Sequence, residues 1–261
     1  MQLEYLKETR LLVSGCSFTD YCWSTWADYL SPYFAQFDNL GSAGSDNATI
    51  ARNVIDSARP HDNVIIMWSG FDRWSGYTDS PPVKSNSTIL LPPKNNNHWC
   101  HTGSIQSNKL FLVNHYHRVE RFHTTMDYIN LLDSHSYKNN YTVHHFSAFP
   151  FFLGEIEKDL DPRITAIYNK YSIANNHLEE PSLQEYQIQN DQYIKTKHEY
   201  HPTDYSDNHP TPLTHWEYCS KIIGPKIGID LGSTVPEYVL EEQHNLVVNH
   251  HASKYDKKYE N

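Results

Sequence analysis

The chain has 261 residues, a formal net charge of −10 and only 20% charged residues, and 38% of its residues are hydrophobic. This length allows one large domain with a sizeable core. The negative charge and the lack of any Lys/Arg cluster argue against nucleic acid as a partner, and no apolar run is long enough to cross a membrane. No basic and apolar leader opens the chain, so a cytoplasmic location is expected.

The four cysteines are scattered and show no CxxC spacing: Cys16, Cys22, Cys100 and Cys219. A disulfide scaffold is not expected at this size, and reduced thiols fit a cytoplasmic protein better. Cys16 is interpreted as a small buried residue of the turn that contains it.

The first predicted element is a buried strand that begins at Leu11 and breaks into small and hydroxyl residues before Asp20. Apolar spacing then predicts a short helix within 22–34 that ends near Pro32. A strand over 35–40 and a small-residue loop follow, and the loop leads into a helix capped by Ser45 or Asp46. The β-branched and apolar run over 62–69 predicts a central parallel strand.

The second half of the chain alternates regular elements with two irregular insertions, at about 70–110 and 150–202. A strongly amphipathic helix over 111–133 and a strand over 141–148 lie between them. A helix over about 212–223 completes a domain of residues 1–225. Residues 226–261 form an extension with an apolar piece and a frayed polar end. This order predicts an α/β fold, with helices on both faces of a mostly parallel sheet.

Ser17 is the candidate nucleophile. It lies on the turn after the first strand, flanked by Gly15 and Thr19, and α/β proteins place reactive groups at the carboxyl ends of parallel strands. The structural alternative is a polar turn in which Ser17 only caps a helix.

Asp207 and His209 form the second signal, in a turn-prone segment before the last helix. At this spacing the carboxylate can reach Nδ1 of the imidazole and leave Nε2 free as a general base. Ser17 would then attack an acyl carbon, and the amides of Ser17 and Gly44 would bind the oxyanion.

With these residues the sequence resembles the SGNH/GDSL hydrolase superfamily, a group of esterases and lipases with a flavodoxin-like three-layer α/β/α fold. The similarity rests on three segments: residues 15–19 (GCSFT), residues 39–44 (NLGSAG) and residues 207–210 (DNHP). It implies Ser17 as nucleophile, Gly44 as oxyanion donor, and Asp207 and His209 as the other triad members. No cofactor or metal is implied. Thr19 also excludes the Gly-x-Ser-x-Gly elbow of α/β-hydrolases.

One block departs from the family. After the central strand these enzymes carry Gly-x-Asn, whose side chain is a third oxyanion donor, whereas this chain reads Trp-Ser-Gly-Phe-Asp-Arg over 68–73. Losing one such donor costs about 10²- to 10³-fold in turnover. Ser69, Arg73 or Asn47 are the candidate substitutes.

Aromatic residues in or beside the first insertion, Trp68, Trp74, Tyr77 and Trp99, are either a stacking wall for sugar rings or the core of an insertion that has few aliphatic residues. A metal site is a further alternative, because His201, Asp204, Asp207, His209 and His215 are close in sequence, but it leaves Ser17 unexplained. His144 and His145 lie on a predicted strand, so one of them is expected to be a hydrogen-bonded core residue.

The reading favoured by these residues is an esterase that hydrolyses a small acyl ester, with an O-acetyl group on a carbohydrate weakly preferred over a lipid. The alternative is a catalytically weakened SGNH domain that serves as a binding or structural part of a larger assembly. The Asn- and Tyr-rich composition resembles that of phage-encoded members, so under this alternative the protein is a virion component.

Overall fold

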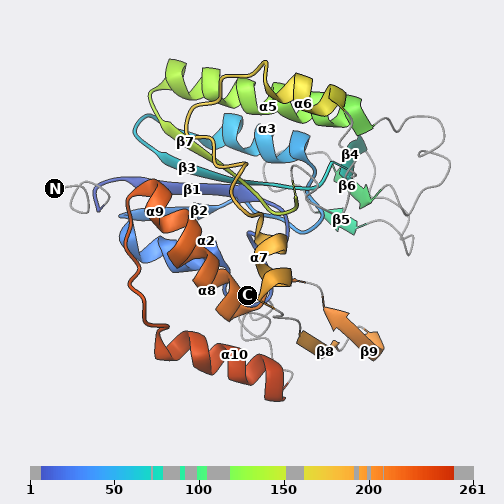
Figure 1. Cartoon of the computed structure of the whole chain (residues 1–261), viewed down its shortest axis with the longest axis vertical. Coiled ribbons are helices and arrows are strands. Elements are labelled where there is room, and N and C mark those ends of the chain that lie inside the picture. Colours follow the sequence, from blue (N-terminus) through green and yellow to red (C-terminus); the bar gives the residue numbers. More distant parts are fainter. Residues whose placement is uncertain are drawn as a thin grey trace.

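The core of the protein is a four-stranded, all-parallel sheet (Figure 1). Its strand order is β2 (Gln36–Asn39), β1 (Arg10–Gly15), β3 (Asn63–Trp68) and β7 (Thr142–Ser147). The computed structural model describes residues 7–71, 73–78, 89–91, 99–104, 118–150, 162–190, 194–198, 201–207 and 209–249; it describes only the backbone of 74–78, 89–91, 99–104, 118, 194–198, 201–207 and 248–249.

Helices cover both faces of this sheet (Figure 1). One face carries α3 (Asn47–Ser57), α5 (Arg118–Asn139) and α6 (Pro162–Tyr168). The other carries α2 (Trp26–Leu30) with η1 (Ser31–Tyr33), α7 (Leu183–Gln189), and α8 (Pro212–Tyr218) continued by the π-turn η3 (Cys219–Ile223) and α9 (Gly224–Ile227). The predicted fold class is confirmed: this is an α/β fold of flavodoxin-like, SGNH-type topology with core strand order 2-1-3-4.

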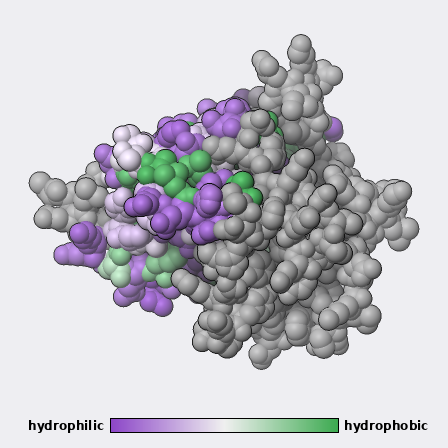
Figure 2. Space-filling model, turned by 90° about the horizontal axis from the view of Figure 1, so that it is seen from below, coloured by the Kyte–Doolittle hydropathy of each residue, from purple (hydrophilic) through white to green (hydrophobic). Residues whose placement is uncertain are grey.

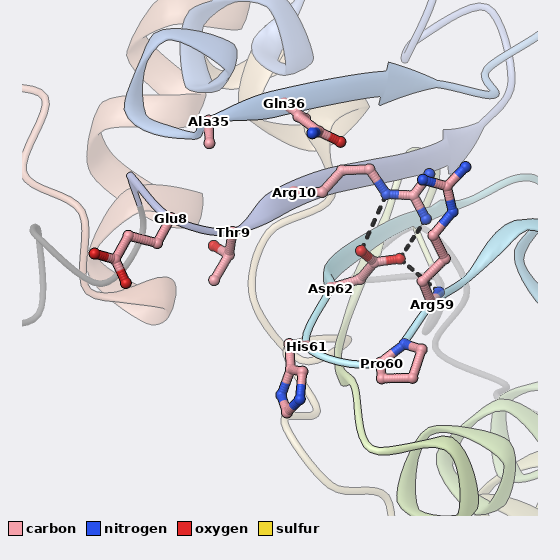
Figure 3. A pocket seen from close by; sticks show the side chains of 9 residues that line it. All are labelled: Glu8, Thr9, Arg10, Ala35, Gln36, Arg59, Pro60, His61 and Asp62. Atoms are coloured by element: carbon pink, nitrogen blue, oxygen red, sulfur yellow. Dashed lines mark hydrogen bonds and ion pairs between the residues drawn. The ribbon is translucent and has the colours of Figure 1, made fainter.

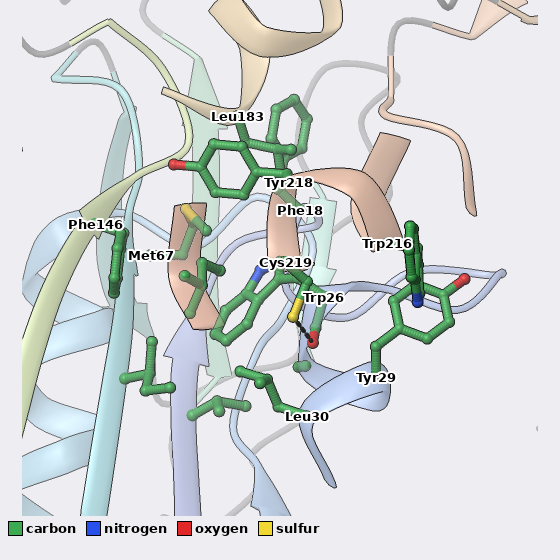
Figure 4. Packing of buried hydrophobic residues seen from close by; sticks show 14 of the residues in the cluster. Phe18, Trp26, Tyr29, Leu30, Met67, Phe146, Leu183, Trp216, Tyr218 and Cys219 are labelled. Carbon is green, nitrogen blue, oxygen red and sulfur yellow. Dashed lines mark hydrogen bonds between the residues drawn. The ribbon is translucent and has the colours of Figure 1, made fainter. Parts of the chain in front are cut away.

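Two apolar clusters hold the layers together, because successive strand side chains point to opposite faces. Leu12 and Ile66 pack with α3 and α5, while Leu11, Val13 and Met67 pack with α2 and α8. Figure 4 shows the second cluster, in which aromatic side chains fill most of the space between sheet and helices. A sheet that is buried on both faces explains why its strands read as nearly continuous apolar runs.

Local sequence signals fix several helix starts. The Asp46 carboxylate accepts a hydrogen bond from the Thr49 amide at 2.9 Å, so one of the two predicted caps of α3 is confirmed. Thr25 and Asp28 form a capping box at α2, which begins later than the apolar spacing indicated. Thr211 caps α8, and Pro212 occupies its first turn, where no amide hydrogen is needed.

The insertions are less irregular than expected. The first contains a small antiparallel sheet of β4 (Arg73–Thr78), β6 (Trp99–Ser104) and β5 (Ile89–Leu91), in that order. The second contains α6, α7 and the hairpin of β8 (Ile194–His198) and β9 (His201–Asp207). Most of these strands are polar, and the apolar β5 has only three residues, so apolar periodicity did not predict them. The predicted start of the helix at 111 lies outside the described residues.

The C-terminal extension contributes a helix, α10 (Glu237–Asn249), that is longer than the apolar piece predicted there. The Glu242 carboxylate accepts from the Ser24 amide at 3.0 Å, and the Gln243 side chain accepts from the Leu213 amide at 3.2 Å. Leu246 packs on Trp23. The polar end over 250–261 lies outside the described residues.

The surface on the α10 side of the molecule is mostly hydrophilic where it is coloured in Figure 2, with smaller hydrophobic areas among the hydrophilic ones. Leu240 and Val247 of α10 are among the exposed large hydrophobic residues. No helix in the described part of the chain is long and apolar enough to cross a membrane.

Arg10, at the start of β1, connects this strand to β2 through Asp38 and to the residue before β3, Asp62. Figure 3 shows its contacts with Asp62. Its buried guanidinium donates to both oxygens of Asp62, to Asp38 and to the Ser57 carbonyl, and the Asp62 hydrogen bond raises the pKa of Arg10. A cavity of about 180 Å³ lies beside this network. It is at the opposite end of the sheet from Ser17.

A short segment over 174–178 runs along the outer edge of β7. The His145 amide donates to the Asn175 carbonyl at 3.3 Å, and the His177 amide donates to the His145 carbonyl at 3.1 Å. Asn176 forms a parallel bridge with His145. The segment therefore occupies the place of a fifth strand.

Burial at this edge disfavours protonated histidine. His144 faces His177, with Nδ1 and Nε2 3.3 Å apart. Burial, with contributions from His177 and His145, lowers the pKa of His144 to about 4, and burial also lowers the pKa of His177. The folded state thus binds fewer protons than the unfolded state between pH 4 and 6.5.

We predict that the free energy of unfolding falls as the pH is lowered from 6.5 to 4, because the unfolded chain takes up protons that folded His144 excludes. His144 alone accounts for roughly 3 kcal/mol of this loss, and His177 adds to it in the same direction. Urea denaturation at pH 7 and at pH 4 measures this loss of unfolding free energy. His144→Gln should make the free energy of unfolding less dependent on pH, whereas His123→Gln, at an exposed position, should leave the dependence unchanged. The prediction is contradicted if the free energy of unfolding falls with pH equally in the wild type and in His144→Gln.

Candidate functional site

The carboxyl ends of the central strands bring three segments together. In the parallel register Gly15 pairs with Met67, so Ser17 and Ser69 each lie two residues beyond the same paired position. The Ser42 amide donates to the Gly15 carbonyl at 3.1 Å, which attaches the loop after β2 to the same edge. This edge is where α/β sheets bind ligands.

The turn that carries Ser17 is compact because Gly15 has no side chain. A Cβ at Gly15 would lie 2.0 Å from the Thr19 Oγ1 and 3.0 Å from the Met67 carbonyl. The Thr19 amide donates to the Cys16 carbonyl at 2.9 Å and closes the turn. The Thr19 carbonyl accepts hydrogen bonds from the Thr25 hydroxyl at 2.8 Å and from the side-chain amide of Asn39 at 3.0 Å. Ser17 is thus held from both sides.

Gly44 lies in a four-residue turn that the Ser45 amide closes on the Ser42 carbonyl at 3.1 Å. Its φ of 78° is in the left-handed region that glycine adopts without steric cost. Within the described part of the chain, neither the Ser17 amide nor the Gly44 amide donates a hydrogen bond.

His209 reaches Ser17 from the far end of the chain. Its Nε2 lies 2.8 Å from the Ser17 Oγ, a hydrogen bond between residues 192 positions apart. The Tyr21 ring stacks on the imidazole with centroids 3.9 Å apart, and Phe18 meets it edge-on at 5.5 Å. The Gln187 side chain donates to the His209 carbonyl at 3.2 Å. The structure thus brings together two of the predicted triad residues.

Asp207 is the last residue of β9, two positions before His209. Its side chain lies outside the described residues, so its role as the partner of His209 stays a prediction.

Of the three candidate substitutes for the missing asparagine, Asn47 is excluded by its own hydrogen bonds. Its amide group donates to the Ser69 carbonyl and to the Thr125 hydroxyl, both at 3.1 Å, and its oxygen accepts from the Ser69 amide at 2.8 Å. Both amide hydrogens are used, so the prediction of Asn47 as an oxyanion donor is wrong. Its side chain instead fixes the backbone of Ser69.

Ser69 and Arg73 keep polar atoms available. The Ser69 hydroxyl is buried and has no hydrogen-bond partner in the described structure. Arg73 lies with its guanidinium carbon 5.2 Å from the centre of the Phe149 ring, and its buried Nη1 has no partner there either. Phe149 packs on Phe18, which connects Arg73 to the surroundings of His209.

Trp68 does not belong to the predicted aromatic wall. Trp68 is completely buried, and its indole N–H donates to the Nδ1 of His145 at 3.2 Å. It faces the helix layer of α3 and α5 and cannot stack on a sugar, because β3 is covered on both faces. The side chains of Trp74, Tyr77 and Trp99 lie outside the described residues.

His145 is the expected core histidine. It is fully buried, accepts from Trp68 and contacts the Asp133 carboxylate through Nε2 at 3.1 Å. His215 of α8 is likewise buried. Among the residues that the structure describes, no group of three or more His, Cys, Asp or Glu residues is arranged to hold a metal ion.

Sequence reasoning missed the residues that hold His209 in place, above all Tyr21 and Gln187. Their role comes from packing between distant segments, and neither residue belongs to a motif. The only signal in the sequence was the concentration of aromatic residues just after Ser17.

Comparisons with known proteins add little to this geometry. No family model matches the sequence, and no curated protein matches it. Among solved structures, the chain is similar to LAE5, described as an alpha/beta hydrolase enzyme from the metagenome of Lake Arreo, Spain. The TM-score is 0.46 and the identity 14%, with 88% of this chain and 99% of that chain covered. A likeness at this level does not bear on function, so the site is judged on its own geometry.

We predict that Gly15→Ala destabilises the protein by about 1–3 kcal/mol, because the added methyl overlaps Thr19 and the Met67 carbonyl. Urea denaturation measures the loss. The double variant Gly15→Ala/Thr19→Ala should recover part of it, since the Thr19 hydroxyl is the nearest obstacle. Equal stability of wild type and Gly15→Ala would show that the turn adapts without cost.

Proposed function

We propose that the protein is a serine ester hydrolase in which Ser17 is the nucleophile and His209 the general base. The observation that carries the proposal is the 2.8 Å hydrogen bond between the Ser17 Oγ and the His209 Nε2. Nucleophile and base within this distance are the signature of an activated hydroxyl. Their position at the carboxyl edge of a parallel sheet supports the same reading.

In the first step the Ser17 Oγ attacks the acyl carbon of the ester while the His209 Nε2 accepts the hydroxyl proton. The imidazolium then returns this proton to the alkoxide leaving group, which departs as the alcohol. Water, deprotonated by His209, attacks the acyl-enzyme and releases the acid, with the proton returned to Ser17. Asp207 is proposed to hold the imidazole tautomer from the Nδ1 side. The reaction requires no cofactor and no metal ion.

The oxyanion would be bound by the amides of Ser17 and Gly44 and by the hydroxyl of Ser69. In support, Ser17 and Ser69 each follow the paired residues Gly15 and Met67 by two positions, on the loops that leave β1 and β3. Asn47 holds the backbone of Ser69 through two hydrogen bonds, so the hydroxyl is presented from a fixed position. Arg73 is the second candidate donor, because its Nη1 lacks a partner in the described structure.

The substrate class that we propose is a small acyl ester, and an O-acetylated carbohydrate is its more specific form. The carbohydrate preference rests on Trp74, Tyr77 and Trp99, because Trp68 is buried. The alternative function, a catalytically weakened domain within a larger assembly such as a virion, is favoured by one observation: Asn47 is the side-chain amide beside Ser69, and it has no hydrogen left for an oxyanion.

Turnover of p-nitrophenyl acetate tests the proposal. We expect hydrolysis by the wild type, and a fall in kcat of at least about 10³-fold in both Ser17→Ala and His209→Gln, because each removes one half of the activated pair. The double variant should lose no more than either single variant. Thermal unfolding checks that each variant is folded. Equal, background-level turnover by the folded wild type and Ser17→Ala would reject the esterase and leave the alternative.

Ser69→Ala is predicted to lower kcat by about 10²- to 10³-fold with little change in KM, because a donor to the developing oxyanion is lost. Ser14→Ala is the matched control: Ser14 is equally buried on β1, but its hydroxyl donates to the Ile50 carbonyl of α3. Arg73→Gln, assayed in parallel, separates the two candidates. Unchanged kcat in Ser69→Ala together with a large loss in Arg73→Gln would transfer the role to Arg73.

A further inference from the structure

The segment that follows Ser17 also holds the loop of His209. The face of the Tyr21 ring lies on the imidazole, with an interplanar angle of 16° and a centroid distance of 3.9 Å. The Trp23 ring meets Tyr21 edge-on, with centroids 4.5 Å apart and an angle of 80°. Nucleophile and base are therefore connected twice, once through the hydrogen bond and once through the aromatic residues of a single short segment.

Trp23 anchors this arrangement on the backbone of the histidine loop. Its indole N–H donates to the Pro210 carbonyl at 2.7 Å, one residue after His209. Trp23 is 1% exposed and packs on Leu246 of α10. The Tyr29 hydroxyl donates to the Pro212 carbonyl at 3.2 Å, where the loop enters α8. The position of the loop backbone is thus fixed independently of the imidazole ring.

A fixed backbone does not by itself set the rotation of the imidazole about its bond to Cβ, and a rotated ring would take Nε2 away from Ser17. The stacked Tyr21 ring restricts this rotation, because the imidazole can turn out of plane only by clashing with it. Phe18, which meets the imidazole at 66°, limits the space on its edge. An electron-rich ring face also favours the imidazolium that forms when Ser17 attacks.

We propose that Tyr21 is a positioning residue that holds the His209 imidazole in the orientation in which Nε2 faces Ser17. The role belongs to the ring and does not require the hydroxyl. The proposal rests on the proposed esterase function for its kinetic consequence, but the stack itself is a property of the fold.

The kinetic test uses three variants assayed with p-nitrophenyl acetate. Tyr21→Leu should lower kcat by about 10²-fold with KM little changed, because a base displaced by about 1 Å costs this much. Tyr21→Phe keeps the ring and should retain at least half of the wild-type kcat. Tyr33→Leu is the control, since Tyr33, like Tyr21, is a partly buried aromatic residue packed against an apolar cluster. Wild-type kcat in Tyr21→Leu, or an equal loss in Tyr21→Phe, would overturn the proposal.

A second measurement does not depend on activity. In NMR spectra of histidine-labelled protein, the ring protons of His209, assigned by their loss in His209→Gln, should be shifted upfield by the Tyr21 ring current. The shift should persist in Tyr21→Phe and disappear in Tyr21→Leu. An upfield resonance in an inactive wild type would reject the esterase and keep the positioning role. A resonance that does not respond to Tyr21→Leu would reject the positioning role, whatever the activity.

Discussion

The structure depends on one close approach. At Gly15 the backbone of β1 lies against the Met67 carbonyl of β3 and against the side chain of Thr19. A methyl group there would meet the Thr19 hydroxyl at 2.0 Å, so the turn that carries Ser17 exists in this shape only because residue 15 has no side chain. Everything else at the site is placed relative to this turn. The loop of Gly44 attaches to the Gly15 carbonyl, and the histidine loop attaches to the residues that follow.

The second organising interaction is the buried side chain of Asn47. An amide that binds both the N–H and the C=O of one residue fixes that residue as firmly as a strand partner would, and it leaves no polar group of its own unsatisfied. An asparagine is thus present next to the strand end, but it acts on the backbone of Ser69 and not on a ligand. A side-chain amide near a site can either hold the backbone in place or donate to a ligand, and the hydrogen bonds that it already makes show which role is open to it.

Much of this arrangement was predictable from the sequence, for identifiable reasons. The runs at 11–14, 62–69 and 141–148 predicted core strands because a sheet buried on both faces tolerates few polar residues. Ser17 and His209 were predictable because each lies in a short motif. The interactions of Trp68 with His145, and of Tyr21 with His209, were not, since they join residues whose separation in sequence carries no pattern. The same holds for Asn47, whose two hydrogen bonds to Ser69 cross 22 positions.

The segment over 174–178 has a consequence for how the protein behaves in a crowded solution. An open strand edge exposes a row of amides and carbonyls on which another chain can pair, and such edges promote aggregation. Here the amide and the carbonyl of His145, in the middle of β7, are occupied from outside by Asn175 and His177 of the same chain. At the opposite edge of the sheet β2 has only four residues, which is too few to offer a long template. Both edges of the parallel core are therefore poorer templates for pairing with another chain than a long open strand would be.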